Sequence, residues 1–144
     1  MDLGRDFSIR PMDPSDRGFV VASWLRDLRD HSPYWRKVHP DDYQTLMPLA
    51  IDQMLDRGRV LLAVDAQAPD IIYSFLAYQQ PHLLLYAYCK RAWRRMGLTR
   101  ALVGVSGLST PYVCPYITSQ GEDALRQALV EWRFNPLASY SLLS

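Results

Sequence analysis

The residues most suited to chemistry lie between Trp93 and Thr99, where the chain reads Trp-Arg-Arg-Met-Gly-Leu-Thr. An apolar run at residues 82–89 precedes this segment and is typical of a buried strand, and a helix-like segment follows from Leu98. The first N–H groups of a helix have no acceptor within the helix, and the helix dipole adds partial positive charge there. Because Gly97 lets a ligand approach the backbone closely, the pattern predicts an anion site, typically for a phosphate.

Basic side chains surround this turn: five of the eleven residues from 90 to 100 are basic, namely Lys90, Arg91, Arg94, Arg95 and Arg100. Two other interpretations of the cluster stay open. One is a solvated helix entry without a ligand, and the other is a nucleic-acid patch in which Tyr34, Trp35 and Trp93 stack on bases. The chain carries 16 basic and 15 acidic residues, for a formal charge of +1, so no global field favours nucleic acid.

The composition is that of one globular domain spanning residues 1–144. Apolar residues make up 49% of the chain, and no stretch approaches the ~18 apolar residues of a membrane span. We therefore expect a cytoplasmic protein with no membrane partner. Cys89 and Cys114 lie in apolar stretches, which favours reduced, buried thiols over a disulfide. The three His and two Cys lack the spacing of metal ligands, so no metal site is expected.

The spacing of apolar residues predicts alternating strands and helices. A short strand at 7–11 leads to a helix that Asp13 caps and that carries Val20, Trp24 and Leu28 on one apolar face. The other elements are expected in this order: loop 31–40, helix 40–57 kinked or divided at Pro48, strands 59–65, 71–79 and 82–89, helix 98–107, strand 112–118, helix 119–131 with Ser119 as its cap, and an extended segment 132–143.

The run from Arg94 to Thr99 resembles the coenzyme A loop of the GCN5-related N-acetyltransferases (the GNAT family), Arg/Gln-x-x-Gly-x-Gly/Ala between a central strand and a helix. Thr99 stands where that family usually has Gly or Ala. The order of the expected elements resembles that of the family over nearly the whole chain, and the sequence as a whole is similar to those of short members encoded by bacteriophages. The resemblance implies a single-domain α/β fold: a mixed, mainly antiparallel sheet flanked by helices, with a splayed central strand pair.

The resemblance also implies an activity, the transfer of an acetyl group from acetyl-CoA, as co-substrate, to an amine. Backbone groups of Ala87, Tyr88 and Cys89 would pair with the pantetheine arm. Arg94 would order the loop, and Lys90 or Arg91 would lie near the ribose phosphate. N–H groups would hold the pyrophosphate, from Arg95, Met96, Gly97, Leu98 and Thr99. The resemblance does not decide whether the acceptor is a small molecule, a protein amine or a nucleobase amine. The host would be a bacterial or phage-infected cell, and the aromatic C-terminal segment offers an edge for a homodimer.

The catalytic groups are the least defined part of the sequence. An amine acceptor is mostly protonated at neutral pH, so a general base or a water relay is expected. Many family members carry a Glu at the position near Leu83, and the nearest ionisable residue here is His82, which is otherwise a polar residue at a strand start. Many members use a Tyr on the last helix as an acid, which residues 129–131 lack, and Tyr116 is the candidate substitute. Nothing marks Cys114 as an activated nucleophile.

The missing Glu and Tyr support an alternative from another class. In that interpretation the chain keeps the acetyltransferase fold as a nucleic-acid-binding or otherwise non-catalytic module, linked in a phage to the modification of nucleobases.

Overall fold

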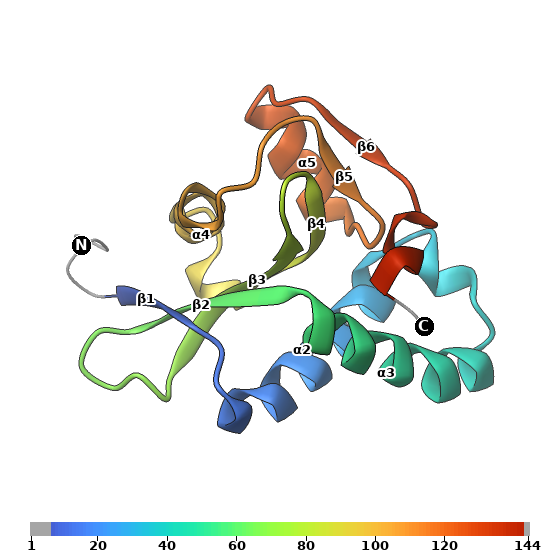
Figure 1. Ribbon diagram of the computed structural model, residues 1–144, viewed down its shortest axis with the longest axis horizontal. Coiled ribbons are helices and arrows are strands. Elements are labelled where there is room, and N and C mark those ends of the chain that lie inside the picture. The colour runs from blue at the N-terminus through green and yellow to red at the C-terminus, as the bar shows by residue number, and fades with distance from the viewer. Residues whose placement is uncertain (1–6, 143–144) are drawn as a thin grey trace.

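The protein folds into a six-stranded sheet with helices on both faces (Figure 1), and the structure, a computed structural model, describes residues 7–142. The strands are β1 (Phe7–Pro11), β2 (Arg59–Asp65), β3 (Ile72–Gln79), β4 (Leu83–Cys89), β5 (Tyr112–Cys114) and β6 (Trp132–Phe134). The helices are α2 (Arg17–His31), α3 (Pro40–Arg57), α4 (Leu98–Ser106) and α5 (Ser119–Gln127). Four short 3₁₀ turns complete the chain: η1 (Pro14–Asp16), η2 (Trp35–Lys37), η3 (Arg91–Trp93) and η4 (Ala138–Leu142).

The strands lie side by side in chain order. β1 to β4 run antiparallel to one another, whereas β5 runs parallel to β4, and β6 runs parallel to β5. β4 and β5 are paired only where both begin, at Leu83 and Val113, and the Val113 N–H donates to the His82 carbonyl at 2.9 Å. Beyond that pair the ladder stops, so β4 has an unpaired edge toward its carboxyl end. The predicted mixed, mainly antiparallel sheet with a splayed central pair is confirmed.

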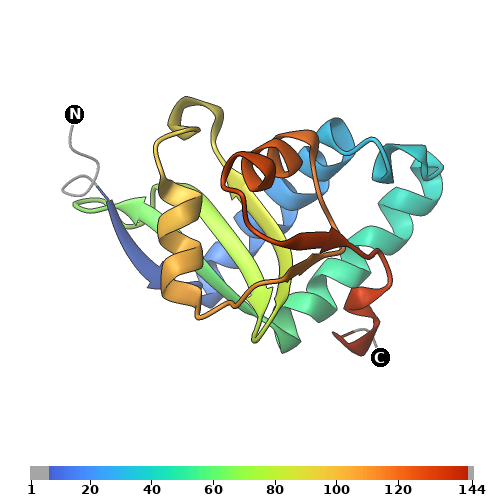
Figure 2. The same cartoon turned by 90° about the horizontal axis from the view of Figure 1, so that it is seen from above.

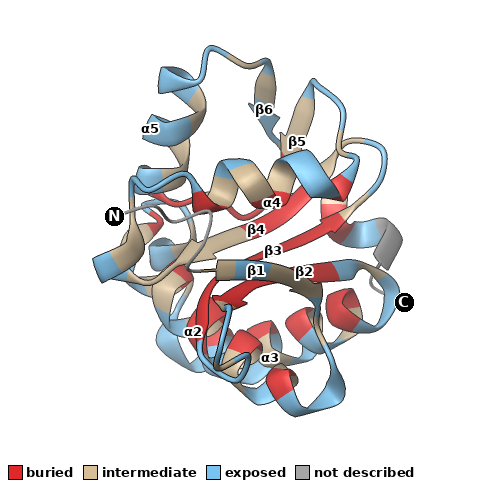
Figure 3. Cartoon of the chain, turned by 90° about the vertical axis from the view of Figure 1, so that its left-hand side faces the viewer, coloured by how far each residue is buried: buried red, intermediate tan, exposed pale blue. Residues whose placement is uncertain are grey.

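Helices cover both faces of the sheet, and Figures 1 and 2 show α2 and α3 on one face and α4 lying across the other. Side chains of successive strand residues point to opposite faces. Val60, Leu62 and Val64 of β2 accordingly belong to the core under α2 and α3, whereas Leu61 and Ala63 belong to the core under α4. Figure 3 shows the buried residues concentrated in β2, β3 and β4 and on the inner sides of α2 and α3.

A β-bulge interrupts β4 in its middle. Ala77 of β3 faces Tyr86, but the next residue, Tyr78, faces Leu84, so Leu85 is the extra residue. Both Leu85 and Tyr86 therefore pack on the α2 and α3 face, while Leu84 packs on the α4 face. The bulge thus directs the tyrosine ring of Tyr86 toward α2.

Near the amino end the predicted strand and cap are confirmed. The Asp13 carboxylate accepts from the Ser15 N–H at 2.9 Å, and the Asp16 carboxylate accepts from the Asp13 N–H at 2.9 Å. Arg10 of β1 donates to Asp16 at 2.7 Å. This hydrogen bond, together with the charge of Arg10, lowers the pKa of Asp16 despite its burial. The pairing fixes the direction in which α2 leaves the sheet.

Some expectations about the helices were wrong. Of the two effects expected of Pro48, division of the helix does not occur, because α3 continues from Pro40 to Arg57 with its apolar side buried against the core. Ser119 is not the cap of α5. The Thr118 hydroxyl accepts from the Gly121 N–H at 3.1 Å, so the cap lies one residue earlier, and the helix ends at Gln127, four residues before the expected end.

The carboxyl-terminal strands are shorter than predicted. β5 ends at Cys114 because Pro115 follows it, and a proline has no N–H to give to a sheet ladder. The expected extended segment 132–143 holds the three-residue β6 and then the turn η4, and its residue 143 lies outside the described part. No helix within residues 7–142 is both long enough and apolar enough to cross a bilayer.

The end of α3 gives a test of the packing between this helix and the sheet. A Cβ atom at Gly58 would lie 2.9 Å from the Met54 carbonyl oxygen and 3.1 Å from that of Tyr78, both rigid backbone atoms. We expect Gly58→Ala to lower the free energy of unfolding by about 1–3 kcal/mol through overpacking. The control is Gly104→Ala in α4, where a Cβ meets nothing within 4 Å, so the added helix propensity should raise it by roughly 0.5–1 kcal/mol. Urea unfolding measures both, and equal effects would contradict the assigned packing.

Candidate functional site

The turn between β4 and α4 is fastened to the sheet at three points. The Lys90 N–H donates to the Tyr73 carbonyl at 2.9 Å. The Trp93 ring stacks on the ring of Tyr73 with 3.9 Å between centroids. Arg94 Nε donates to the Cys89 carbonyl at 3.2 Å, which ties the turn back to the end of β4. The backbone of this turn is therefore positioned by the sheet rather than by a ligand.

Beyond Arg94 the backbone turns sharply into the helix. Arg95 and Gly97 both have left-handed backbone angles, with φ values of 65° and 82°. The first helical N–H with an acceptor is that of Ala101, which donates to the Gly97 carbonyl at 3.0 Å. The N–H groups of residues 98–100 consequently have no acceptor within α4. A Cβ atom at Gly97 would meet nothing within 4 Å, so the space beside this residue, directly before these donors in the chain, is open.

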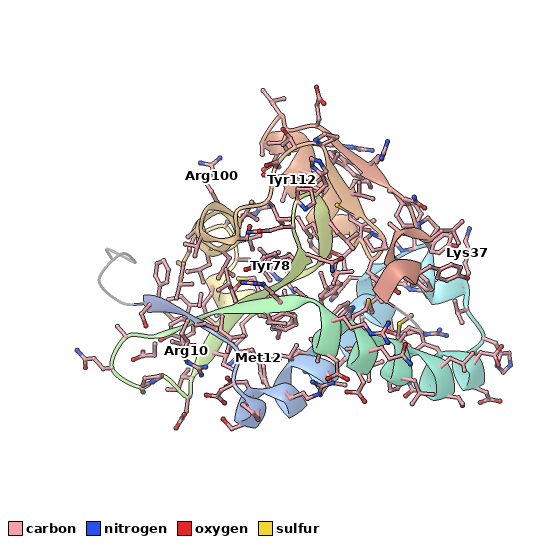
Figure 4. The ribbon with its side chains drawn as sticks, in the orientation of Figure 1. Arg10, Met12, Lys37, Tyr78, Arg100 and Tyr112 are labelled. Carbon is pink, nitrogen blue, oxygen red and sulfur yellow. The ribbon has the colours of Figure 1, made fainter. Side chains whose placement is uncertain are left out.

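The five basic side chains around the turn do not form one stripe. Arg91, Arg95 and Arg100 are exposed, and Figure 4 shows Arg100 projecting from α4 into solvent. Lys90 Nζ lies 5.4 Å from the centre of the Phe19 ring, and Arg94 turns toward α2. Lys90, Arg91 and Arg94 thus lie on the α2 side of the turn, whereas Arg100 projects from α4.

The register of β4 decides which backbone groups face the unpaired edge. In an antiparallel ladder, residues alternate between those that exchange hydrogen bonds with the neighbouring strand and those whose N–H and C=O groups point away. The bond from Lys90 to Tyr73 and the pairing of Tyr88 with Phe75 turn the backbone of Lys90 and Tyr88 toward β3. Ala87 and Cys89 therefore present their backbone groups to the gap. Of the three residues predicted to line it, Tyr88 contributes its side chain rather than its backbone.

A pocket of about 450 Å³ opens on the α2 side of the sheet, where β4 and β5 have parted. It lies between the two halves of the sheet, because Tyr88 belongs to β4 and Gln120 to α5, the helix that follows β5. The remaining lining residues are charged or titratable: Arg26, Asp27, Asp30, His31, Arg91 and Arg94.

Asp27 is the centre of a polar cluster in this pocket, and its side chain is only 13% exposed. Its carboxylate accepts a hydrogen bond from the Tyr86 hydroxyl. One carboxylate oxygen lies 3.6 Å from Arg94 Nη2 and 3.7 Å from His31 Nε2. The sequence analysis did not select Asp27. Its position three residues after Trp24, beside the apolar stripe of the helix, was the one available signal that an acidic side chain sits at the border of the core.

His82 lies at the closed end of the gap, just before the Leu83–Val113 pair. Its Nδ1 donates to the Ser109 carbonyl at 2.8 Å, so Nδ1 is the nitrogen that carries the proton in the neutral ring. The ring thus connects the start of β4 to the segment after α4.

Tyr116 is buried on the α2 and α3 face. Its hydroxyl lies 3.0 Å from Ser139 Oγ, and its ring contacts those of Trp24 and Trp35 at centroid distances of 5.9 and 5.0 Å. Burial raises the pKa of Tyr116, so the phenol stays protonated.

Both cysteines are free thiols, as predicted. Burial raises the pKa of Cys114 to about 12, and burial also raises the pKa of the half-buried Cys89. Within residues 7–142, no three His, Cys, Asp or Glu side chains gather closely enough to hold a metal ion.

No model of a protein family matches this chain, and no curated protein matches it in sequence. Solved structures match its fold. The apo form of YjaB from Escherichia coli is 18% identical, with a TM-score of 0.57 over 85% of this chain and 79% of its own. A ribosomal-protein-alanine N-acetyltransferase from Brucella melitensis biovar Abortus 2308 is 15% identical, with a TM-score of 0.55 over 85% of this chain and 90% of its own.

The chain spans about three fifths, 61%, of a GCN5-related N-acetyltransferase from Rhodopseudomonas palustris, at 14% identity and a TM-score of 0.46. The two better-aligned neighbours show that this chain has the single-domain α/β fold of the GNAT acetyltransferases, as its sequence predicted. At these identities the likeness concerns the fold.

The environment of Cys114 gives a test of nucleophilic catalysis by this thiol. With a pKa of about 12, on the order of one Cys114 in 10⁴ is a thiolate at pH 8, and the thiolate is the reactive form. We expect folded Cys89→Ala protein to resist Ellman's reagent at pH 8 over minutes and the same protein in guanidinium to react at once. Cys114→Ala, which keeps the half-buried Cys89, should react faster than Cys89→Ala when folded. Rapid labelling of folded Cys89→Ala would make Cys114 a candidate nucleophile again.

Proposed function

We propose that this chain is an acyl-CoA-dependent N-acyltransferase that moves an acetyl group from acetyl-CoA to an amine. One observation carries the proposal: a left-handed turn with open backbone donors stands beside the unpaired edge of β4. An anion site next to a free strand edge suits a long ligand with phosphates at one end and amides along its length. Acetyl-CoA is such a ligand, and the shared fold of acetyltransferases supports the choice.

Each part of acetyl-CoA has a counterpart in this arrangement. The N–H groups from Arg95 to Thr99 would hold the pyrophosphate, with Arg94 positioning the turn through the Cys89 carbonyl. The pantetheine amides would pair with the outward backbone groups of β4, as an added strand pairs with a sheet edge. The Ala87 N–H, which faces the gap, would stabilise the negative charge that develops on the thioester oxygen.

His82 and Tyr116 are the proton-transfer candidates that the sequence suggested. For Tyr116 a raised pKa suits a proton donor, since the leaving thiolate needs a proton, but its hydroxyl is already bonded to Ser139. For His82, Nδ1 is bonded to the Ser109 carbonyl, so Nε2 would have to act as the base, but the ring lies at the closed end of the gap.

Binding of acetyl-CoA is the first test. At a hundred times its dissociation constant a ligand stabilises the folded state by roughly 2.7 kcal/mol, so the melting temperature should rise by several degrees. Gly97→Asp should remove the shift, because it places a negative side chain in the open space before the N–H groups while Asp tolerates the left-handed angle. Thermal unfolding with and without acetyl-CoA measures both.

The matched control is Gly104→Asp, which adds the same charge at an exposed, unobstructed position of the same helix and should keep the shift. The absence of a shift in the wild type at millimolar acetyl-CoA would refute the proposal. If DNA or RNA then binds with an affinity that falls steeply with salt, the nucleic-acid module is the correct alternative.

His82→Gln tests the base suggested by the sequence. A positioned base contributes a factor of about 10² or more, so loss of that base would lower turnover by at least this factor with acetyl-CoA affinity unchanged. We expect turnover within a few fold of wild type, because the imidazole serves the Ser109 carbonyl and the glutamine amide can donate the same bond. Release of the CoA thiol, followed with an amine acceptor, measures the rate, and a hundredfold loss would establish His82 as the base.

A further inference from the structure

The pocket around Asp27 holds acidic side chains that the proposed cofactor, itself an anion, does not explain. The donors for the pyrophosphate stand at the start of α4, which covers one face of the sheet. The pocket opens beside α2, which covers the other face, and it reaches the gap through Tyr88. A second molecule that entered from the α2 side of the sheet could reach the thioester without passing the bound cofactor.

We propose that this pocket is the acceptor site, that Asp27 binds the amine and takes its proton, and that the acceptor is a small amine that also carries a carboxylate or phosphate. This inference rests on the proposed acyl transfer and adds its substrate class. The pocket volume of about 450 Å³ suits a small molecule rather than a protein segment.

The position of Asp27, beside β4, suits a carboxylate that binds the amine. Its carboxylate is held by the hydroxyl of Tyr86, the residue directly before Ala87, whose N–H faces the gap. The amine would therefore lie between the carboxylate and the thioester carbon. His31 and Arg94 flank the same carboxylate, and Tyr88 stands at the pocket wall. Burial, and next the charge of Asp27, raises the pKa of Tyr88, so its hydroxyl remains protonated.

Two arginines at the rim indicate the second charge of the acceptor. Arg26 and Arg91 line the pocket and are exposed, and neither has a hydrogen-bond or ion-pair partner among residues 7–142. A guanidinium binds carboxylates and phosphates in preference to other groups. Asp27 in the interior and free arginines at the rim therefore fit an amine at one end of the acceptor and an anionic group at the other.

The reaction balances without a further reactant. The neutral amine nitrogen attacks the thioester carbon, and as the C–N bond forms one nitrogen proton moves to the Asp27 carboxylate. The C–S bond then breaks, and the proton held by Asp27 passes through water to the thiolate, which restores the carboxylate. The products are the N-acetylated acceptor and the free CoA thiol.

The substrate class is tested with two matched pairs of amines, O-phosphoethanolamine against ethanolamine and β-alanine against β-alaninamide, by release of the CoA thiol. We expect the anionic member of at least one pair to have a kcat/KM about tenfold or more above its partner. Arg26→Gln should remove most of that preference, whereas Arg133→Gln, an exposed arginine on β6 outside the pocket, should keep it. Equal rates within both pairs, or no turnover of any of the four amines, would overturn the assigned class.

The role of Asp27 is tested with Asp27→Asn, whose amide oxygen can still accept from Tyr86. We expect kcat/KM for the preferred amine to fall about 10²-fold or more, while the variant still folds and its melting temperature still rises with acetyl-CoA. Asp123→Asn, an exposed residue of α5 outside the pocket, is the control and should keep full activity. Full activity in Asp27→Asn would overturn its assignment.

The two proposals fail in different ways. Absence of any melting shift with acetyl-CoA refutes the acyltransferase itself. A normal shift together with an unselective or Asp27-independent reaction refutes only the acceptor site. If Asp27→Asn does not fold, the Arg26→Gln result and the amine pairs still decide the class of acceptor.

Discussion

A single pairing, between Leu83 of β4 and Val113 of β5, determines where a ligand can enter this protein. Buried backbone groups normally find partners, and a sheet that keeps its ladder intact has none to offer. Here the two strands part after one pair, so Ala87 keeps outward backbone groups in the middle of the molecule. The turn before α4 and the pocket beside α2 both lie at the open end of the same gap. Without that divergence the turn would be an isolated anion site and the pocket a surface depression.

Aromatic packing holds the two halves of the sheet together where the ladder does not. Trp24 of α2 stacks on Tyr86 with 5.1 Å between centroids and meets Tyr116, which follows β5, edge to face. Trp35 packs on Tyr116, and its Nε1 donates to the Pro115 carbonyl at 3.1 Å. These rings join β4 to the β5 segment through the helical layer, so the gap can stay open without separating the domain.

The same packing positions the polar side chains of Tyr86, Asp27 and Arg94. The bulge in β4 turns Tyr86 toward α2, and its hydroxyl reaches Asp27. Arg94 is drawn away from the phosphate side by Asp27 and by the Cys89 carbonyl, so it links the turn to the pocket. A cofactor in the gap and an acceptor in the pocket, as proposed, would thus contact opposite ends of one connected network.

Local patterns in the sequence determined the strands from 59 to 89, the first three helices and the glycine turn, because hydrophobic spacing and backbone chemistry act over a few residues. Gly97 could be assigned a role in close backbone approach from its place between a strand and a helix, whereas its left-handed angle is a finding of the structure. The continuity of α3 through Pro48 was missed, because the burial of its apolar face is decided by neighbours distant in sequence. The end of β5 has a local cause, since Pro115 has no N–H to give to the ladder. Asp27 was missed because its one local signal, a place beside the apolar stripe of α2, does not indicate its partners, and only the fold brings it to Tyr86, 59 residues away, and to Arg94.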